Sequence, residues 1–212
     1  VTIFTDDDRG LFSQIAGAMA LSGASIVDAK IVTLANGMAL DTFGVQDSDG
    51  GPFAEEARLK KLESNLERAL TGRIRLAKEL AAKRSSLPTR ASAFRVPVRV
   101  ILDNKASRTH TLIEVNGRDR PGFLYDVTSA ITSQGLQISS AHISTYGERV
   151  VDVFYVKDIF GMKVDHEAKL KQLRKTLQAA VADPLNPVDP GMPSPPRQPV
   201  RRKTPAQTPA SA

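Results

Sequence analysis

The sequence contains no cysteine and no tryptophan, and only 5% of its residues are aromatic. Without cysteine the chain forms no disulfide, no thiolate zinc site and no cysteine nucleophile, which fits a reducing compartment. No apolar run approaches the length of a membrane-spanning helix, about 18 residues. These absences predict a cytoplasmic protein whose activity does not depend on thiol chemistry.

The chain opens on "VTIFTDDDRG", which has neither an initiator methionine nor the charged-then-apolar order of a signal peptide. Its first residues already have the pattern of a strand. We therefore expect a piece of a longer protein. The 212 residues, 41% of them apolar, can build one large or two small domains.

The net charge of +6 is unevenly distributed along the chain. Residues 184–212 hold four basic residues against one acidic residue, so half of the excess lies there, together with nine of the 13 prolines. This composition cannot build a packed core and predicts a disordered basic tail. The overall charge is therefore weak support for nucleic-acid binding, and a solvated chain end is the simpler interpretation.

The sequence contains an internal repeat, which is seen when the sequence is aligned with itself at an offset of 112 residues, so that Gly10 matches Gly122. The first copy includes "DDRGLFSQI" and the second includes "DRPGFLYDV", and the match runs without a gap to Thr33 and Thr145. After a one-residue deletion it continues through Asp41 and Asp152. Further matched pairs are Asp7 with Asp119, Ile15 with Val127, Gly23 with Gly135, Ala29 with Ala141 and Phe43 with Phe154. Such a match predicts two copies of one structural unit.

Each copy predicts the same order of elements. An apolar strand enters the Asp-x-x-Gly turn, and apolar residues then recur at helical spacing up to Gly23 or Gly135, where a left-handed helix cap favours glycine. Two β-rich runs joined by a short turn predict a hairpin, and a second helix follows. The expected strands are 1–5, 24–34, 39–46, 109–117, 136–146 and 149–157, and the expected second helices are 53–82 and 165–182.

A further strand, "FRVPVRVIL", completes the first copy and gives the order β-α-β-β-α-β. This order predicts an α+β, ferredoxin-like fold, in which an antiparallel sheet carries its helices on one face. The second copy lacks such a strand, because "DPLNPVDPG" is too rich in proline. We predict two ferredoxin-like domains, at 1–103 and 104–183, before the tail at 184–212. The fourth strand of the second is absent or comes from another chain.

The Asp-x-x-Gly turn suits a small zwitterion. A helix N-terminus presents unpaired N–H groups and partial positive charge to a carboxylate. Gly10 and Gly122 leave the backbone accessible, and Asp7 and Asp119 can accept hydrogen bonds from an ammonium group. The turn can therefore hold both ends of an α-amino acid. The structural alternative is that Asp caps the helix, Pro121 occupies its first turn and glycine allows close packing.

Both copies resemble ACT domains, small regulatory modules that bind amino acids between paired copies. The resemblance rests on "DDRGLFSQIAGAMALSGASIVDAKIVT" and "DRPGFLYDVTSAITSQGLQISSAHIST". More narrowly, "NGMALDTFGVQD", the long charged helix, "FRVPVRVILDNKASRTHTLIEVNGRDRPGFLYDVTSAI" and "ERVVDVFYVKDIFGMKV" resemble the C-terminal ACT pair of the bifunctional uridylyltransferase/uridylyl-removing enzymes. This similarity extends over residues 1–183.

The resemblance implies a glutamine sensor. In that family the parent enzyme transfers UMP from UTP to the PII nitrogen-signalling protein when glutamine is scarce, and removes it when glutamine is abundant. The resemblance further implies pairing of ACT units within or between chains. It implies ligand-binding residues at Asp7, Gly10, Leu11, Asp119, Gly122 and Phe123, with Ser139 and Ser140 as side walls. Arg9 stands where the commoner motif has proline, so the two loops are not equal.

The sequence contains no catalytic constellation. The family's nucleotidyl transfer needs a Gly-Ser motif with paired Asp for Mg²⁺, and its hydrolysis needs a His-Asp metal cluster; neither motif occurs. His110, His142 and His166 lack ligand spacing. The acidic run at 6–8 is more simply a charged helix entry than a cation site. We predict no cofactor for these residues and, from the resemblance, Mg²⁺ for the parent enzyme.

Three other interpretations stay open. RRM domains share the βαββαβ order, but they place aromatic residues within a Lys/Arg-Gly-Phe signature, whereas the third strands here contain Asp41 and Asp152. A dimerisation module that binds no ligand is also possible, since exposed sheet edges favour pairing. The parent could also be another enzyme of amino-acid metabolism that carries an ACT module.

Overall fold

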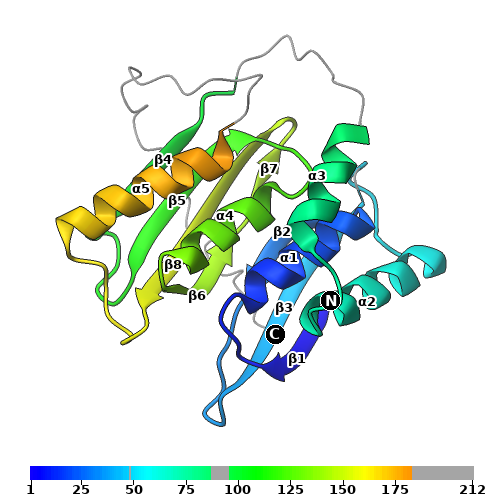
Figure 1. Cartoon of the computed structure of the whole chain (residues 1–212), viewed down its shortest axis with the longest axis horizontal. Helices are drawn as coiled ribbons and strands as arrows, with labels where there is room; N and C mark the ends of the chain where they lie inside the picture. The colour runs from blue at the N-terminus through cyan, green and yellow to red at the C-terminus, as the bar shows by residue number, and fades with distance from the viewer. Residues whose placement is uncertain (48, 87–95, 183–212) are drawn as a thin grey trace, which may run out of the picture.

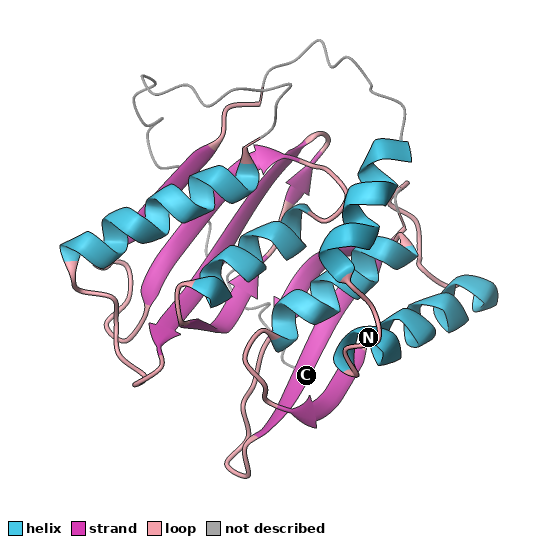
Figure 2. Cartoon of the chain, viewed as in Figure 1, coloured by secondary structure: helices cyan, strands magenta, loops and turns pink. Residues whose placement is uncertain are grey.

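The computed structural model describes residues 1–47, 49–86 and 96–182, which form one antiparallel sheet with helices across one face (Figure 1). The strand order is β1-β3-β2-β6-β8-β5-β4, and β7 pairs with β8. The predicted α+β class, the antiparallel sheet and the one-sided helix layer are confirmed (Figure 2). The tail predicted at 184–212 lies outside the described residues.

Each half contains the predicted strand, helix and antiparallel strand pair, followed by further helix. The first half contains β1 (Thr2–Asp6), α1 (Leu11–Ser22), β2 (Ser25–Lys30), β3 (Met38–Gln46), α2 (Glu56–Leu70) and α3 (Leu76–Ser86). The second half contains β4 (Arg99–Asp103), β5 (Thr111–Arg118), α4 (Phe123–Ser133), β6 (Leu136–His142), β7 (Thr145–Tyr146), β8 (Arg149–Asp158) and α5 (Glu167–Val181). Gly23 and Gly135 have the predicted left-handed conformation.

The core lies between the sheet and the helix layer. Apolar residues of α1 and α4 are fully buried against it, among them Ile15, Met19, Val127 and Ile131. On β3 and β8 every second residue faces the helices, as expected for the period of a strand. Because one face of the sheet is covered and the other is not, this alternation fixes which strand residues point inward.

The single long helix predicted at 53–82 is wrong, because the chain breaks it into α2 and α3. Gly72 takes φ +68°, and the N–H groups of Gly72 and Arg73 donate to the carbonyl oxygens of Ala69 and Arg68. This bond pair is the Schellman motif that ends many helices. The break redirects α3 across the molecule, where it contacts α1 and approaches the second half.

The assignment of the strand around 99–103 to the first unit is also wrong. β4 pairs antiparallel with β5, from Arg99 opposite Asn116 to Asp103 opposite Leu112. Only a short loop separates the two strands, and consecutive strands are usually neighbours. The second half therefore takes its fourth strand from the segment that precedes it in the same chain. The domain boundaries otherwise stay a prediction.

The two halves meet at β2 and β6, where one residue pair, Ala29 opposite Ala141, joins them. These two alanines are equivalent positions of the repeat. Equivalent residues facing each other across antiparallel strands define an approximate twofold axis through this pair. In the helix layer α1 packs beside α4 at the same junction (Figure 1).

Candidate functional site

Two cavities lie at the junction, one at each Asp-x-x-Gly turn. The first cavity, about 290 Å³, is lined by residues 7–12 of the first half and by residues 136–139 of the second. The second cavity, about 680 Å³, is lined by residues 119–124 of the second half and by residues 23–26 of the first. Both volumes suit a small organic ligand. Each cavity is thus shared between the halves.

The two turns place glycine at the N-cap of each helix. Gly10 has φ 87° before α1 and Gly122 has φ 77° before α4, a conformation that residues with a side chain rarely adopt. No side chain caps either helix at this position. The capping role considered for Asp7 and Asp119 is therefore wrong, and the helix N-termini face the cavities without a side-chain acceptor.

The structure brings most of the predicted site residues to these cavities. Asp7, Gly10, Leu11 and Ser139 line the first cavity, and Asp119, Gly122 and Phe123 line the second. Ser139 stands at a bulge of β6 and so walls the turn of the opposite half. Among the described residues that line the two cavities, Ser140 is absent. Their roles as ligand contacts stay a prediction.

Two site residues escaped the sequence reasoning. Asp41 lines the first cavity and Asp152 the second, and each is only 1% exposed. On β3, Asp41 lies between the inward-facing residues Ala39 and Phe43. On β8, Asp152 lies between the inward-facing residues Val150 and Phe154. The signal was present in the sequence: an acid stands at an inward-facing position of an apolar strand, at the same place in both copies.

The carboxylate of Asp41 is incompletely satisfied. Burial raises its pKa to about 6, a backbone hydrogen bond with Val32 opposes that rise, and the negative charge of Asp7 adds to it. Its Oδ1 atom has no hydrogen-bond partner. A buried carboxylate in this state either keeps a proton or gains from a cationic partner.

Asp152 has the equivalent environment in the second cavity. Burial raises its pKa to about 7, and the charge of Asp119 contributes to the rise. The Ser144 N–H donates to its Oδ1 at 3.4 Å, at the position equivalent to Val32. Asp119 is exposed at the rim, yet desolvation by the surrounding walls raises its pKa as well.

The rim of the first cavity carries both signs of charge. Asp7 is exposed, and its Oδ2 accepts a hydrogen bond from Thr33 Oγ1 at 2.5 Å. Arg9 and Lys157 add positive charge to the lining. Partial burial and the neighbouring Lys157 lower the pKa of His110, which also lines this cavity. Opposite charges within one small cavity suit a zwitterion.

Helix α3 packs against the second turn and contributes Lys83 to the lining of the second cavity. Lys83 Nζ donates to the carbonyl oxygens of Ala20 at 2.6 Å and Leu21 at 3.2 Å, at the end of α1. A Cβ placed on Gly122 would lie 3.1 Å from Leu80 Cδ1, whereas its nearest neighbours at Gly10 would be 3.5 Å away. The second turn is therefore the more tightly covered of the two.

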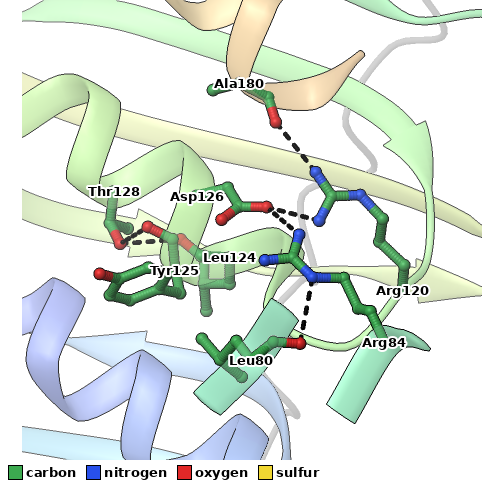
Figure 3. A network of polar contacts seen from close by, with 8 residues as sticks. All are labelled: Leu80, Arg84, Arg120, Leu124, Tyr125, Asp126, Thr128 and Ala180. Atoms are coloured by element: carbon green, nitrogen blue, oxygen red, sulfur yellow. Dashed lines mark hydrogen bonds and ion pairs between the residues drawn. The ribbon is translucent and has the colours of Figure 1, made fainter. Parts of the chain in front are cut away.

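A network of polar contacts fixes α3 to this turn (Figure 3). The Oδ2 atom of Asp126 on α4 accepts hydrogen bonds from Arg84 at 2.7 Å and from Arg120 at 2.5 Å. Arg120 also donates to the carbonyl oxygen of Ala180 at 2.9 Å, near the end of α5. The loop before Gly122 is thus tied to three helices.

Residues 1–47, 49–86 and 96–182 lack two features. They hold no group of three or more His, Asp or Glu side chains placed to bind a metal ion. None of their helices combines the length and the apolar character needed to cross a bilayer.

The comparisons with known proteins agree with this geometry. Residues 99–188 match the family model described as an ACR9-like, ACT-like domain. This part of the chain is therefore similar to an ACT-like domain. The match starts at the first residue of β4, in agreement with the pairing of β4 and β5.

The chain is similar in sequence to proteins named bifunctional uridylyltransferase/uridylyl-removing enzyme. The identity is 56% over 185 residues with the enzyme of Azospirillum brasilense, and 57% over 182 residues with that of Gluconobacter oxydans. The alignments cover 87% and 85% of this chain but only 20% and 19% of those enzymes. The resemblance predicted from the sequence is confirmed, and the chain corresponds to about one fifth of its relatives' length.

Among solved structures, an unknown protein from Galdieria sulphuraria aligns over 84% of this chain and 88% of its own. Its sequence identity is 15% and its TM-score is 0.26. The family assignment therefore rests on the sequence relatives and the ACT-like match.

Proposed function

We propose that this chain is the glutamine-binding regulatory region of a bifunctional enzyme that attaches UMP to the PII protein and removes it. The observation that carries the proposal is the pair of equivalent cavities between the halves, each with a helix N-terminus at Gly10 or Gly122 and a buried acid. The similarity to uridylyltransferase/uridylyl-removing enzymes supports the parent activity.

The groups around each cavity complement the parts of glutamine. Its carboxylate suits the N–H groups at the start of α1 or α4. Its ammonium group suits the acids of the linings. In the first cavity Gln137 and Ser139 provide hydrogen-bonding partners for a side-chain amide.

The position of the cavities supports a regulatory role. A ligand that contacts both halves stabilises the arrangement in which both contacts are made. Glutamine would switch the parent enzyme by its difference in affinity for two such arrangements. Uridylyl transfer, Mg²⁺ and the PII substrate belong to the remainder of the enzyme, which we propose to act in the cytoplasm.

Calorimetric titration of the chain with L-glutamine tests this function, with Gly10→Val and Gly122→Val as variants. Each substitution forces a β-branched residue to a positive φ at a cavity entrance, so we expect affinity to fall at least about tenfold at that site. Gly161→Val is the matched control, because Gly161 also has positive φ but has open space around it.

Thermal unfolding of all three variants separates lost folding from lost binding. If the wild-type chain takes up no glutamine, or if both cavity variants bind as the wild type does, the proposal fails. Binding of a different amino acid in its place would favour an ACT module from another enzyme of amino-acid metabolism.

A further inference from the structure

Asp41 and Asp152 occupy positions that the fold assigns to apolar side chains. Each lies on the covered face of the sheet, between residues that belong to the core, and each is 1% exposed. A charged carboxylate at such a place costs stability unless a partner compensates it. An apolar side chain would fill either place without this cost, so the fold itself does not require these acids.

The protein compensates these acids only in part. Each carboxylate receives a backbone hydrogen bond, from Val32 or Ser144. No basic side chain within the described residues forms an ion pair with either acid. Oδ1 of Asp41 has no partner at all, and both residues line a cavity.

We infer that Asp41 and Asp152 hold the ammonium group of an α-amino acid in the first and second cavity. The inference rests on the proposed function and assigns the recognition of the amino group within it. It shifts this role from Asp7 and Asp119, which are exposed at the rims. Asp7 is moreover engaged by Thr33.

The arrangement selects a class of ligand. The start of the helix and the buried acid belong to one cavity in each half, Gly10 with Asp41 and Gly122 with Asp152. A molecule must carry both a carboxylate and an ammonium group to satisfy both. Carboxylic acids without an amino group, and N-acylated amino acids, leave the buried acid uncompensated and are rejected.

Proton exchange should accompany binding. An acid with a raised pKa keeps a fraction of its proton near neutral pH, and an incoming ammonium group favours the ionised form, so that proton passes to the buffer. The charged and titratable groups facing Asp41 across the first cavity are Asp7, Asp8, Arg9, His110 and Lys157. Those facing Asp152 across the second are Asp47, Asp49, Lys83, Asp119 and Arg120.

The test compares the wild-type chain with Asp41→Asn, Asp152→Asn and the double variant. Asparagine keeps the shape of the side chain, removes its charge and replaces one carboxylate oxygen by an amide NH₂ donor. The probes are L-glutamine, a panel of other L-amino acids and glutaramate, which is glutamine without its amino group. Asp28→Asn is the control, because Asp28 is exposed on β2 and outside both linings.

We expect each single variant to weaken one site by about 10- to 100-fold, the range for loss of a charge-assisted hydrogen bond. The double variant should lose both sites, and glutaramate should not bind the wild-type chain. Titrations at pH 6.5 in buffers of different ionisation enthalpy should show proton release by the wild-type chain and none by the double variant.

The outcomes distinguish the inference from the function. Glutamine binding that is unchanged in the double variant, or glutaramate binding as tight as that of glutamine, overturns the inference and leaves glutamine sensing in place. Binding of another amino acid, lost in the double variant, overturns glutamine as the effector and supports the inference. Absence of binding by every amino acid overturns both.

Discussion

The two cavities derive from one repeated sequence but differ in what surrounds them. The turn beside the second packs against α3, with Leu80 against Gly122 and Arg84 bound to Asp126. At the position of Asp126 the first half has Gln14, which carries no charge. Helix α3 exists as a separate element because Gly72 ends α2. The two turns have equivalent sequences, but α3 packs against only the second, so the second turn has the larger set of contacts.

The two turns differ in the number of helices that hold them in place. A ligand at the second cavity would lie beside a turn that is tied to α3, α4 and α5, so we expect its affinity to respond to substitutions in those helices. A ligand at the first cavity would lie beside a turn in which Thr33 Oγ1 donates a hydrogen bond to Asp7 Oδ2.

The largest effect is expected from the pH dependence of stability in Asp152→Asn. Because the pKa of Asp152 is raised to about 7, the folded chain binds more protons than the unfolded chain between about pH 4 and 7. Its unfolding free energy therefore falls as pH rises through this window. Asparagine removes the fall, so at pH 8 the variant should be more stable by up to about 4 kcal/mol.

Asp41→Asn should show the same behaviour with a smaller gain, because the pKa of Asp41 is raised only to about 6. Urea unfolding of both variants and the wild type between pH 4 and pH 8 measures the difference. Parallel pH profiles for wild type and variants would contradict burial of these carboxyl groups.

A somewhat smaller loss is expected when Leu80 is shortened to alanine. Leu80 is fully buried, and Leu→Ala at such a site costs about 3 kcal/mol through lost contacts and the space left behind. The variant should also open the second cavity beside Gly122 while the first keeps its affinity. Leu59→Ala on α2, where the side chain is 41% exposed, is the control and should cost far less. Equal effects of Leu80→Ala on both sites would disprove the local role of α3.

The smallest effect is expected from Arg84→Met. It removes one of two ion pairs to a partly exposed Asp126, so stability should fall by about 1 kcal/mol. Ligand affinity should change at the second site alone. Arg73→Met breaks a more exposed pair with Glu67 and should change neither stability nor binding. Calorimetry that resolves the two sites decides between these results.

Local patterns made much of the fold predictable from the sequence. Helical spacing, hairpin turns and the repeat gave the order and type of most elements, because these signals act within a few residues. The partner of β4 was not predictable in the same way, since a strand pattern does not state which sheet edge it joins. The break at Gly72 was hidden by the leucine stripe on either side of it.

The candidate site was predicted at its rim and missed at its interior. The spacing of aspartate and glycine in the sequence predicted the turns at Gly10 and Gly122. Asp41 and Asp152 appeared in the repeat, but their meaning depends on which face of the strand is covered. That face is set by helices distant in sequence, so only the assembled sheet shows that both acids point inward.

The joint at Ala29 and Ala141 has a mechanical consequence. In the described residues this is the one pairing between strands of the two halves, so the packing of α1 beside α4 and the contacts of α3 with the second half carry the rest of the junction. The first cavity is lined by Gly10 at the start of α1 and the second by Gly23 at its end. Helix α1 therefore spans the distance between the two cavities, and a ligand that displaced it from α4 at one end would change the wall of the other.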